Sequence, residues 1–209
     1  MSFEKILSLR TVKNFIMSLI AGVIITSFVT EYSQNVMADI TNSVVRLHIL
    51  ANSDSEEDQR LKTEVRDDII DYLKPMLDNA VSVEETEEII RNNLENIKTE
   101  AEKSIKKHGY TYSATVVFGK FDFPEKSYEN ATFPSGRYNA LRIIIGEGEG
   151  RNWWCVLYPQ LCFSESTNGE LPEKSKNKLK NVLTDDEYDM ITSADNVKFK
   201  LKIVEMFSH

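Results

Sequence analysis

Apolar and charged positions divide the chain into an apolar leader and a mixed remainder. Lys5, Arg10 and Lys13 precede a stretch that carries no charged residue from position 14 to position 30. This stretch is slightly shorter than the about 20 residues of a membrane span and slightly longer than the about 7–15 apolar residues of a signal peptide. A buried helix of an intracellular domain is a third reading, and the absence of a charged face argues against it. The basic residues in front favour an N-terminus that stays inside.

The leader ends at a candidate cleavage site. Val36 and Ala38 occupy the positions three and one residues before Asp39, where signal peptidases favour small side chains. We therefore expect residues 1–38 to be a signal peptide cut between Ala38 and Asp39, or an uncut anchor that holds the protein in the membrane. In both cases residues 39–209 lie outside the membrane. They contain no second apolar stretch, long linker or internal repeat, so we expect a single exported domain.

Two amphipathic helices are predicted in the first part of this domain. Ser53 and Ser82 each stand three residues before a glutamate, which is the pattern of a capping box at a helix start. Apolar residues then recur every three or four positions as far as residues 73 and 105, which gives each helix one buried stripe. Pro75 ends or kinks the first helix, and Gly109 stops the longer second one.

Period-two alternation of apolar and polar residues predicts five strands. They cover residues 43–50, 110–119, 138–146, 152–157 and 197–203. In the last of them the polar positions are all lysines, which is typical of a strand with one solvated face. A short helix or two is expected within residues 172–190. This order predicts an α+β fold, in which two long helices pack on one face of a mainly antiparallel sheet, preceded by the N-terminal signal or anchor helix.

Composition and charge exclude several classes of protein. With 41% hydrophobic and 28% charged residues the chain is globular, which excludes collagen, coiled coils and long disordered repeats. Two cysteines are too few for a disulfide scaffold or for a zinc site built on cysteine pairs. The net charge of -8 argues against binding to nucleic acid, which requires a basic surface. We expect no nucleic-acid partner.

The residue types that usually carry catalysis form no recognisable pattern. The chain has three histidines, at positions 48, 108 and 209, and no Gly-x-Ser-x-Gly motif. Cys155 and His48 would form a thiol–imidazole pair only if their strands were neighbours, and a cysteine in an apolar strand is more typical of a buried core. The glycines at 146, 148 and 150 have the wrong spacing for a phosphate loop and are better explained by a flexible hairpin turn.

Acidic residues leave two alternatives open. The run from Asp54 to Asp58 offers ligands for calcium, but it lacks the spacing of a calcium loop and is better explained by the cap of a helix. No Asp-Thr-Gly or Asp-Ser-Gly motif of an aspartic protease is present. A pair of carboxylates for glycoside hydrolysis stays an alternative, because such partners meet in space and not in sequence. We expect no catalytic residue, no metal and no cofactor.

Cys155 and Cys162 are the most specific local feature. They are separated by six residues that include Tyr158-Pro159, and outside the membrane a disulfide can join them across this bend. The alternative is a pair of reduced, buried thiols. The adjacent Trp153 and Trp154 belong to one predicted strand, so their side chains should point to opposite faces, one into the core and the other toward the surface.

Three segments of the exported domain carry a distinctive pattern. They are Arg46-Leu47-His48-Ile49-Leu50-Ala51-Asn52-Ser53-Asp54-Ser55 with the following Glu57-Asp58-Gln59, then Gly119-Lys120-Phe121-Asp122-Phe123-Pro124, and the run from Ala140-Leu141-Arg142 through Gly146-Glu147-Gly148 and Asn152-Trp153-Trp154-Cys155-Val156-Leu157 to Leu161-Cys162-Phe163. Together they resemble the stage II sporulation protein R family of endospore-forming bacteria. The resemblance covers residues 43–163. Gln160 departs from the family pattern, in which a second proline is expected.

The resemblance implies a signalling protein and supplies no catalytic residue. A protein of this family is made in the forespore and secreted into the septal space. There it activates a membrane-embedded aspartic protease of the mother cell, which cuts the precursor of the sigma factor sigma E. An uncut leader would add a contact with the membrane. The resemblance therefore predicts a protein that is not an enzyme and has this protease as its partner.

The partner-contact surface is expected where aromatic side chains gather, because aromatic anchors dominate interface energetics. The candidates are Phe121, Phe123, Tyr128 and Phe133 in the loop 121–133, together with Trp153 and Trp154. The alternative function is a secreted cell-envelope hydrolase, with two facing carboxylates in a cleft or with His48 within reach of Cys155. A passive structural protein of the septal space is the third possibility.

Overall fold

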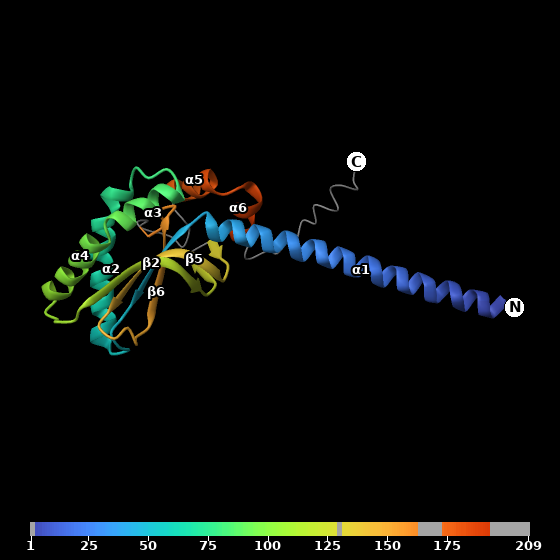
Figure 1. Ribbon diagram of the computed structural model, residues 1–209, viewed down its shortest axis with the longest axis horizontal. Coiled ribbons are helices and arrows are strands. Elements are labelled where there is room, and N and C mark those ends of the chain that lie inside the picture. The colour runs from blue at the N-terminus through green and yellow to red at the C-terminus, as the bar shows by residue number, and fades with distance from the viewer. Residues whose placement is uncertain (1–2, 129–130, 163–172, 193–209) are drawn as a thin grey trace. The chain divides into compact units, whose positions relative to one another are not determined.

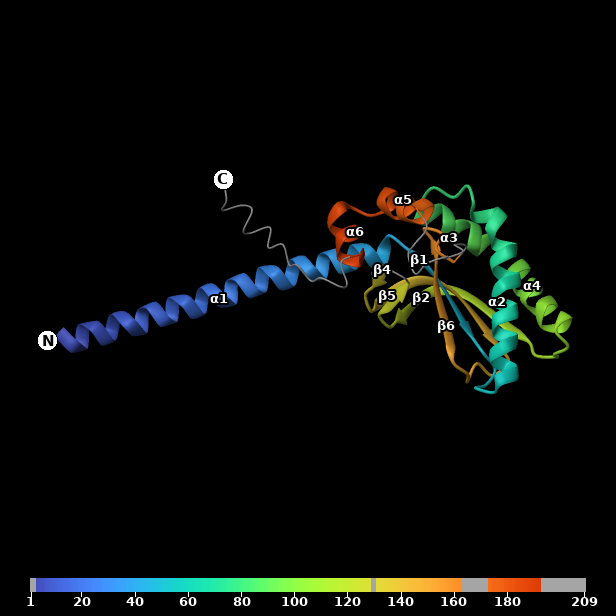
Figure 2. The same ribbon diagram turned by 180° about the vertical axis from the view of Figure 1, so that it is seen from behind.

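The computed structural model describes residues 3–128, 131–162 and 173–192 (Figures 1 and 2). The chain forms two compact units, Met1–Ala38 and Asp39–His209. The described residues of the first unit are helical throughout, whereas the second unit holds both helices and strands.

The first unit consists of helix α1 (Phe3–Asn42), whose last four residues belong to the second unit. Residues 10–42 are long and apolar enough to cross a membrane, a test that a signal sequence near the N-terminus also passes. The hydroxyls of Thr26 and Ser27 donate to carbonyl oxygens four residues earlier, at 2.8 and 2.9 Å. These bonds satisfy the two polar groups where an apolar environment would penalise them. The helix is consistent with a signal peptide or an anchor.

The second unit is built around a four-stranded sheet in the order β2-β5-β1-β6. Its strands are β1 (Val45–Leu50), β2 (Ala114–Phe123), β5 (Gly136–Ile145) and β6 (Asn152–Tyr158). β1 runs parallel to β5, and the β2–β5 and β1–β6 pairs are antiparallel. A short hairpin of β3 (Lys126–Tyr128) and β4 (Ala131–Phe133) lies within the connection from β2 to β5. The fold is therefore α+β with a mainly antiparallel sheet, as predicted.

Three helices contribute to the core of this unit: α2 (Glu56–Leu77), α3 (Val83–Asn92) and α4 (Leu94–Lys107). The prediction of two long helices is wrong in one respect, because the second helix is divided. The break lies at Asn93, whose backbone (φ -115, ψ 10) leaves helical geometry. The side-chain amide of Asn93 donates to the carbonyl oxygen of Ile89 at 2.8 Å. α5 (Glu173–Val182) and α6 (Asp185–Thr192) correspond to the short helices expected after residue 172.

The cap of α2 is displaced from its predicted position. Ser55 is the N-cap and accepts a hydrogen bond from the backbone N–H of Asp58 at 3.1 Å. The predicted cap, Ser53, instead donates its hydroxyl to the Asp58 carboxylate at 2.6 Å. The Ser53 oxygen accepts from the backbone N–H of Ser55 at 3.2 Å, before the helix begins, and not from an N–H of the first turn. Pro75 lies within the last turn of α2, and the predicted cap Ser82 of α3 is confirmed.

The core lies between these helices and one face of the sheet (Figures 1 and 2). Alternate residues of the two central strands enter it, namely Val45, Leu47 and Ile49 of β1 and Leu141, Ile143 and Ile145 of β5. The apolar stripes of α2 and α4 complete the same cluster of buried residues. Because strand side chains alternate, the intervening residues point to the opposite face of the sheet, which we call the open face.

Strand β2 begins four residues later than predicted, at Ala114. The turn that ends α4 delays the start of the strand. Gly109 adopts a φ of 87, and its N–H donates to the carbonyl oxygen of Lys106 at 3.0 Å. The N–H of Tyr110 donates to Ile105 at 3.1 Å. These bonds close the helix before the strand starts. The predicted strand 197–203 lies outside the described residues.

The glycine-rich turn between β5 and β6 is held in place rather than flexible. Asn52, just after β1, accepts at Oδ1 from the N–H of Glu147 and at its carbonyl oxygen from the N–H of Glu149, both at 3.1 Å. A side chain at Gly150 would overlap the carbonyl oxygen of Ser53, so the close approach of the two loops requires glycine. This corner fixes the ends of β1, β5 and β6 against one another.

Candidate functional site

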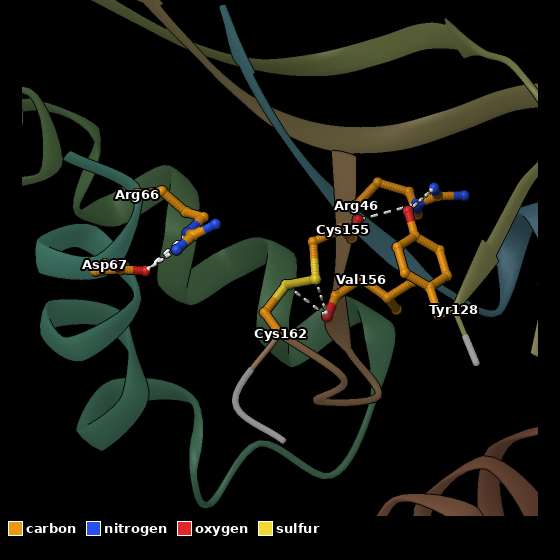
Figure 3. Close-up of a disulfide and its surroundings, with 7 residues drawn as sticks. All are labelled: Arg46, Arg66, Asp67, Tyr128, Cys155, Val156 and Cys162. Carbon is orange, nitrogen blue, oxygen red and sulfur yellow. Dashed lines mark hydrogen bonds and ion pairs between the residues drawn. A yellow bond between two sulfur atoms is a disulfide. The ribbon is translucent and has the colours of Figure 1, made fainter. Parts of the chain in front are cut away.

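A buried arginine organises one end of the open face. Arg46, in β1, is completely buried, with 0% of its surface exposed. Its Nε donates to the carbonyl oxygen of Cys155 at 3.0 Å, and its Nη2 donates to the hydroxyl of Tyr128 at 2.7 Å (Figure 3). Its Nη1 has no hydrogen-bond acceptor among the described residues.

Four aromatic rings surround this guanidinium and take the place of a carboxylate. The Cζ atom of Arg46 lies 4.6 Å from the ring centre of Phe123, 4.9 Å from that of Tyr138, 5.5 Å from that of Phe133 and 5.6 Å from that of Tyr128. Such contacts attract a cation to the electron-rich ring face. Burial lowers the pKa of Arg46, and the two tyrosines act in the opposite direction. We call Arg46 with these four rings the arginine cage.

Three of the predicted contact residues belong to the arginine cage. Phe123 and Phe133 are buried, and Tyr128 is half-buried. Their rings surround Arg46, so they hold the β3–β4 hairpin on the open face of the sheet. Their part in binding a partner stays a prediction.

Phe121 and Trp154 lie at the two ends of a row of stacked side chains across the open face. Arg142 of β5 stacks on Phe121 of β2, with 3.8 Å between its Cζ atom and the ring centre. Its Nε donates to Nδ1 of His48 in β1 at 3.0 Å. The imidazole in turn stacks on Trp154 of β6, with ring centres 3.7 Å apart and 15° between the planes. We call these four residues the open-face row.

His48 is a neutral member of this row. Because its Nδ1 accepts from Arg142, the ring proton is on Nε2, which donates to Oδ1 of Asn152 at 2.6 Å. Burial lowers the pKa of His48 from 6.5 to about 4, the charge of Arg142 acts in the same direction, and the bond to Asn152 opposes both. The imidazole therefore stays uncharged at neutral pH and accepts a hydrogen bond that an imidazolium could not accept.

Trp153 points to the opposite face of the sheet from Trp154. It packs against the core and, like Trp154, is half-buried. The guanidinium of Arg66 in α2 lies 5.2 Å from the centre of the Trp153 indole. Arg66 also pairs with Asp67 at 2.7 Å (Figure 3). The two tryptophans thus belong to separate surfaces, one beside the helices and one on the open face.

Cys155 and Cys162 are joined by a disulfide, with their Cα atoms 5.8 Å apart (Figure 3). The bridge spans the bend that contains the cis peptide bond between Tyr158 and Pro159. It lies on the side of β6 that faces the helices, while Arg46 approaches the Cys155 carbonyl from the other side (Figure 3). The redox state of this pair in the exported protein stays a prediction.

The thiol–imidazole pair that the sequence allowed is not formed. β1 and β6 are neighbours, as such a pair requires, but His48 is opposite Trp154 in the register and Cys155 is opposite Leu47. The imidazole and the sulfur therefore lie on opposite faces of the sheet. The sulfur is also part of the disulfide.

The acidic run after β1 builds a helix cap and a loop corner. Burial alone would raise the pKa of Asp58, but hydrogen bonds from Ser53 and Asn52 outweigh it and hold that pKa below its usual value. Asp54 accepts from the backbone N–H of Arg151 at 2.7 Å. Among the described residues, no group of three or more His, Cys, Asp or Glu side chains is placed to hold a metal ion.

Comparisons with known proteins agree with the pattern of the three segments. The family model described as stage II sporulation protein R matches residues 41–168, more than half of the chain. The chain belongs to this family. The "Stage II sporulation protein R" of Bacillus subtilis (strain 168) is 40% identical over 148 residues, which are 71% of this chain and 66% of that relative. The match thus spans just under two thirds of the relative's length, and no solved structure matches the chain.

Membership of the stage II sporulation protein R family gives the chain a role in sporulation. The family is named for this role and not for an enzymatic activity. The matched residues contain β1, the arginine cage, the open-face row and both cysteines. The arrangement on the open face therefore lies in the part of the chain that carries the family likeness.

Two arginines of these clusters were not singled out from the sequence. Arg46 and Arg142 each stand in the middle of an apolar strand, at positions that alternate with core residues. A cation at such a position is normally assigned to solvent. The available signal was that each strand is apolar on both sides of its arginine, which is typical of a strand covered on both faces.

Replacing Arg46 tests whether the arginine cage stabilises the fold. Arg46→Ala removes the cation and leaves a cavity among four rings, so we expect the free energy of unfolding to fall by about 3 kcal/mol. Arg46→Met refills the space with an apolar side chain and should lose clearly less. The control Arg91→Ala removes an arginine that is 52% exposed and should change stability by less than about 0.5 kcal/mol. Urea unfolding measures all three, and equal losses for Arg46→Ala and Arg91→Ala would contradict the expectation.

The disulfide is tested by alkylation of the purified protein without reductant. We expect neither Cys155 nor Cys162 to be modified, and both to react after reduction. Because the bridge closes a short loop, the double variant Cys155→Ser/Cys162→Ser should lower the free energy of unfolding by about 2.5 kcal/mol. Mass spectrometry gives the number of modified thiols. Two modified thiols in the protein that was never reduced would show that the pair is not bridged.

The low pKa of His48 predicts a pH dependence of stability. Below the ordinary pKa of 6.5 the unfolded chain binds a proton at His48, and the folded chain binds it only near its pKa of about 4. The free energy of unfolding should therefore fall as the pH is lowered, by about 2 kcal/mol between pH 7 and pH 5 from this residue alone. Urea midpoints of the wild type and of His48→Gln, compared at both pH values, isolate this contribution. Parallel pH profiles of the two proteins would refute it.

Proposed function

We propose that this chain is an exported signal that activates a membrane-embedded aspartic protease during sporulation. It is secreted from the forespore into the septal space, or it stays anchored with its folded domain outside the membrane. The activated protease of the mother cell then cuts the sigma E precursor. The chain itself catalyses no reaction in this scheme. The observation that carries the proposal is membership of the stage II sporulation protein R family.

The apolar helix α1 supports export. It provides a segment of the length and composition that a signal sequence or an anchor needs. His48 and Cys155 lie on opposite faces of the sheet, so they do not form the thiol–imidazole pair of the hydrolase alternative. The open-face row adds half-buried aromatic side chains of the kind that anchor interfaces.

An activator of this kind works by differential affinity. It shifts the protease toward its active arrangement only as far as it binds that arrangement more tightly than the inactive one. A tenfold ratio of affinities corresponds to about 1.4 kcal/mol. A domain that is rigid before it binds loses little of this free energy to the ordering of its own loops and side chains. The loop corner that is held by hydrogen bonds to Asn52 and the arginine cage are both consistent with such a rigid domain.

Reconstitution in a non-sporulating bacterium tests the proposal. The protease and the sigma E precursor are expressed with the full chain, without it, or with a variant that lacks residues 2–38 and stays inside. We expect cleavage of the precursor only with the full chain, at a yield at least about tenfold above the other two, because activation requires the domain outside the membrane. Mass spectrometry of the precursor identifies the cut.

A protease with its catalytic aspartate replaced is the control for the source of the cleavage. No cleavage in cells that hold all three proteins, correctly located, would overturn the activator role. Cleavage that persists with the inactive protease would show that another enzyme cuts the precursor. Equal cleavage with the variant retained inside the cell would overturn export as a requirement.

A further inference from the structure

The open face of the sheet is covered at one end and uncovered at the other. At the covered end Arg46, Tyr138, Ala140 and Val156 are buried. At the other end His48 is buried, and the side chains around it are half-buried or exposed. These are Leu50, Val117, Phe121, Arg142, Ile144 and Trp154, which we call the open-face patch. Val117, at 37% exposed, is the most accessible of its large apolar side chains.

Arg142 is the charged side chain of this patch, and it is fixed before any partner binds. Its guanidinium lies flat on Phe121, 3.8 Å from the ring centre, and its Nε is used by the hydrogen bond to His48. These two contacts orient the planar group and leave its terminal N–H groups available. Burial lowers the pKa of Arg142, and the carboxylate of Asp122 opposes this through space.

Arg142 differs from the other exposed arginines that stack on aromatic rings. Arg66, over Trp153, pairs with Asp67 at 2.7 Å. Arg91, over Phe118, pairs with Glu87 at 3.5 Å. No carboxylate among the described residues lies within ion-pair distance of Arg142. Arg142 therefore makes no direct ion pair within the described residues, and Asp122 acts on it only through space.

We propose that the open-face patch binds a peptide segment that carries one carboxylate between apolar side chains, with the carboxylate on Arg142. This inference rests on the proposed function for the identity of the partner, an outward-facing segment of the membrane-embedded protease. The carboxylate supplies the direct ion pair that Arg142 does not make within the described residues, and the flanking apolar side chains cover Val117, Ile144 and Leu50. A carboxylate–guanidinium pair in a largely apolar surface is stronger and more directional than one in water.

Charge complementarity favours this occupant over a second copy of the chain. The net charge of -8 makes two copies repel each other. A neutral apolar segment would leave the Arg142 guanidinium partly desolvated without a counter-charge, which is unfavourable. The preformed stack on Phe121 lowers the ordering cost of binding.

A matched pair of substitutions at Val117 isolates the charge. Val117→Asp places a negative charge beside the incoming carboxylate, whereas Val117→Lys is equally polar but adds a positive one. Val117 lies directly opposite Arg142 in the β2–β5 register, so the aspartate also gives Arg142 a carboxylate from the chain itself and competes with the incoming one. In the reconstituted cells we expect Val117→Asp and Arg142→Glu to reduce precursor cleavage at least about tenfold, and Val117→Lys to reduce it far less. The control on the other face, Arg91→Ala, should cleave as the wild type does.

Photo-crosslinking identifies the occupant directly in the full chain. A benzophenone amino acid at position 121 should crosslink to the protease, and Arg142→Glu should reduce the yield at least about tenfold. The same probe at position 118, on the helix-facing side, should give no such product. In cells that carry Arg142→Glu, cleavage should be restored by an Asp→Lys or Glu→Lys substitution at one position in the outward-facing segments of the protease.

The outcomes separate this inference from the proposed function. If the wild-type chain supports no cleavage, the activator role fails first. If the wild type supports cleavage while Val117→Asp and Val117→Lys behave alike, the carboxylate is wrong and the inference is overturned. A position-121 probe that crosslinks to a second copy of the chain, and not to the protease, also overturns it.

Discussion

The burial of Arg46 is the constraint on which the open face depends. A guanidinium inside a protein normally requires a carboxylate, and the described residues place none beside this one. The fold instead directs Nε at the Cys155 carbonyl, Nη2 at the Tyr128 hydroxyl and four ring faces at the cation. Arg46 itself belongs to β1, and these contacts come from β2, β5, β6 and the β3–β4 hairpin. A charge that is costly to bury therefore specifies how four separate segments meet.

The two faces of the sheet have different physical roles as a result. The face toward α2, α3 and α4 is a conventional apolar core and carries the stability of the domain. The open face combines apolar side chains with two oriented arginines, one enclosed by its rings and one at the border of solvent. His48 shares features of both surroundings. It is buried, as Arg46 is, but it donates and accepts hydrogen bonds in a fixed tautomer. His48 therefore joins the arginine cage, where its ring meets Phe123 edge-on, to the open-face row.

The sequence predicted the parts that depend on local periodicity and missed those that depend on pairing in space. The helical stripes, the cap at Ser82 and the α+β class follow from spacing alone. The cap at Ser55 and the break at Asn93 were missed, because the Asp58 carboxylate and a side-chain bond to Ile89 override the local pattern. The aromatic contact candidates were read as one surface. Only the contacts in space show that Phe123 and Phe133 surround Arg46, while Phe121 stacks on Arg142 and Trp154 stacks on His48.

The central position of β1 has a consequence for the order in which the sheet can form. Register pairs Arg46 with Ala140 on one side and with Val156 on the other, so both neighbours of the first strand come from late in the chain. In a polypeptide threaded through the membrane from its N-terminus, this strand arrives outside well before the strands that flank it, and its backbone groups wait unpaired. A partly translocated or truncated molecule has no completed sheet to present. The four-stranded sheet is therefore complete only after the strand that ends at Tyr158 has emerged.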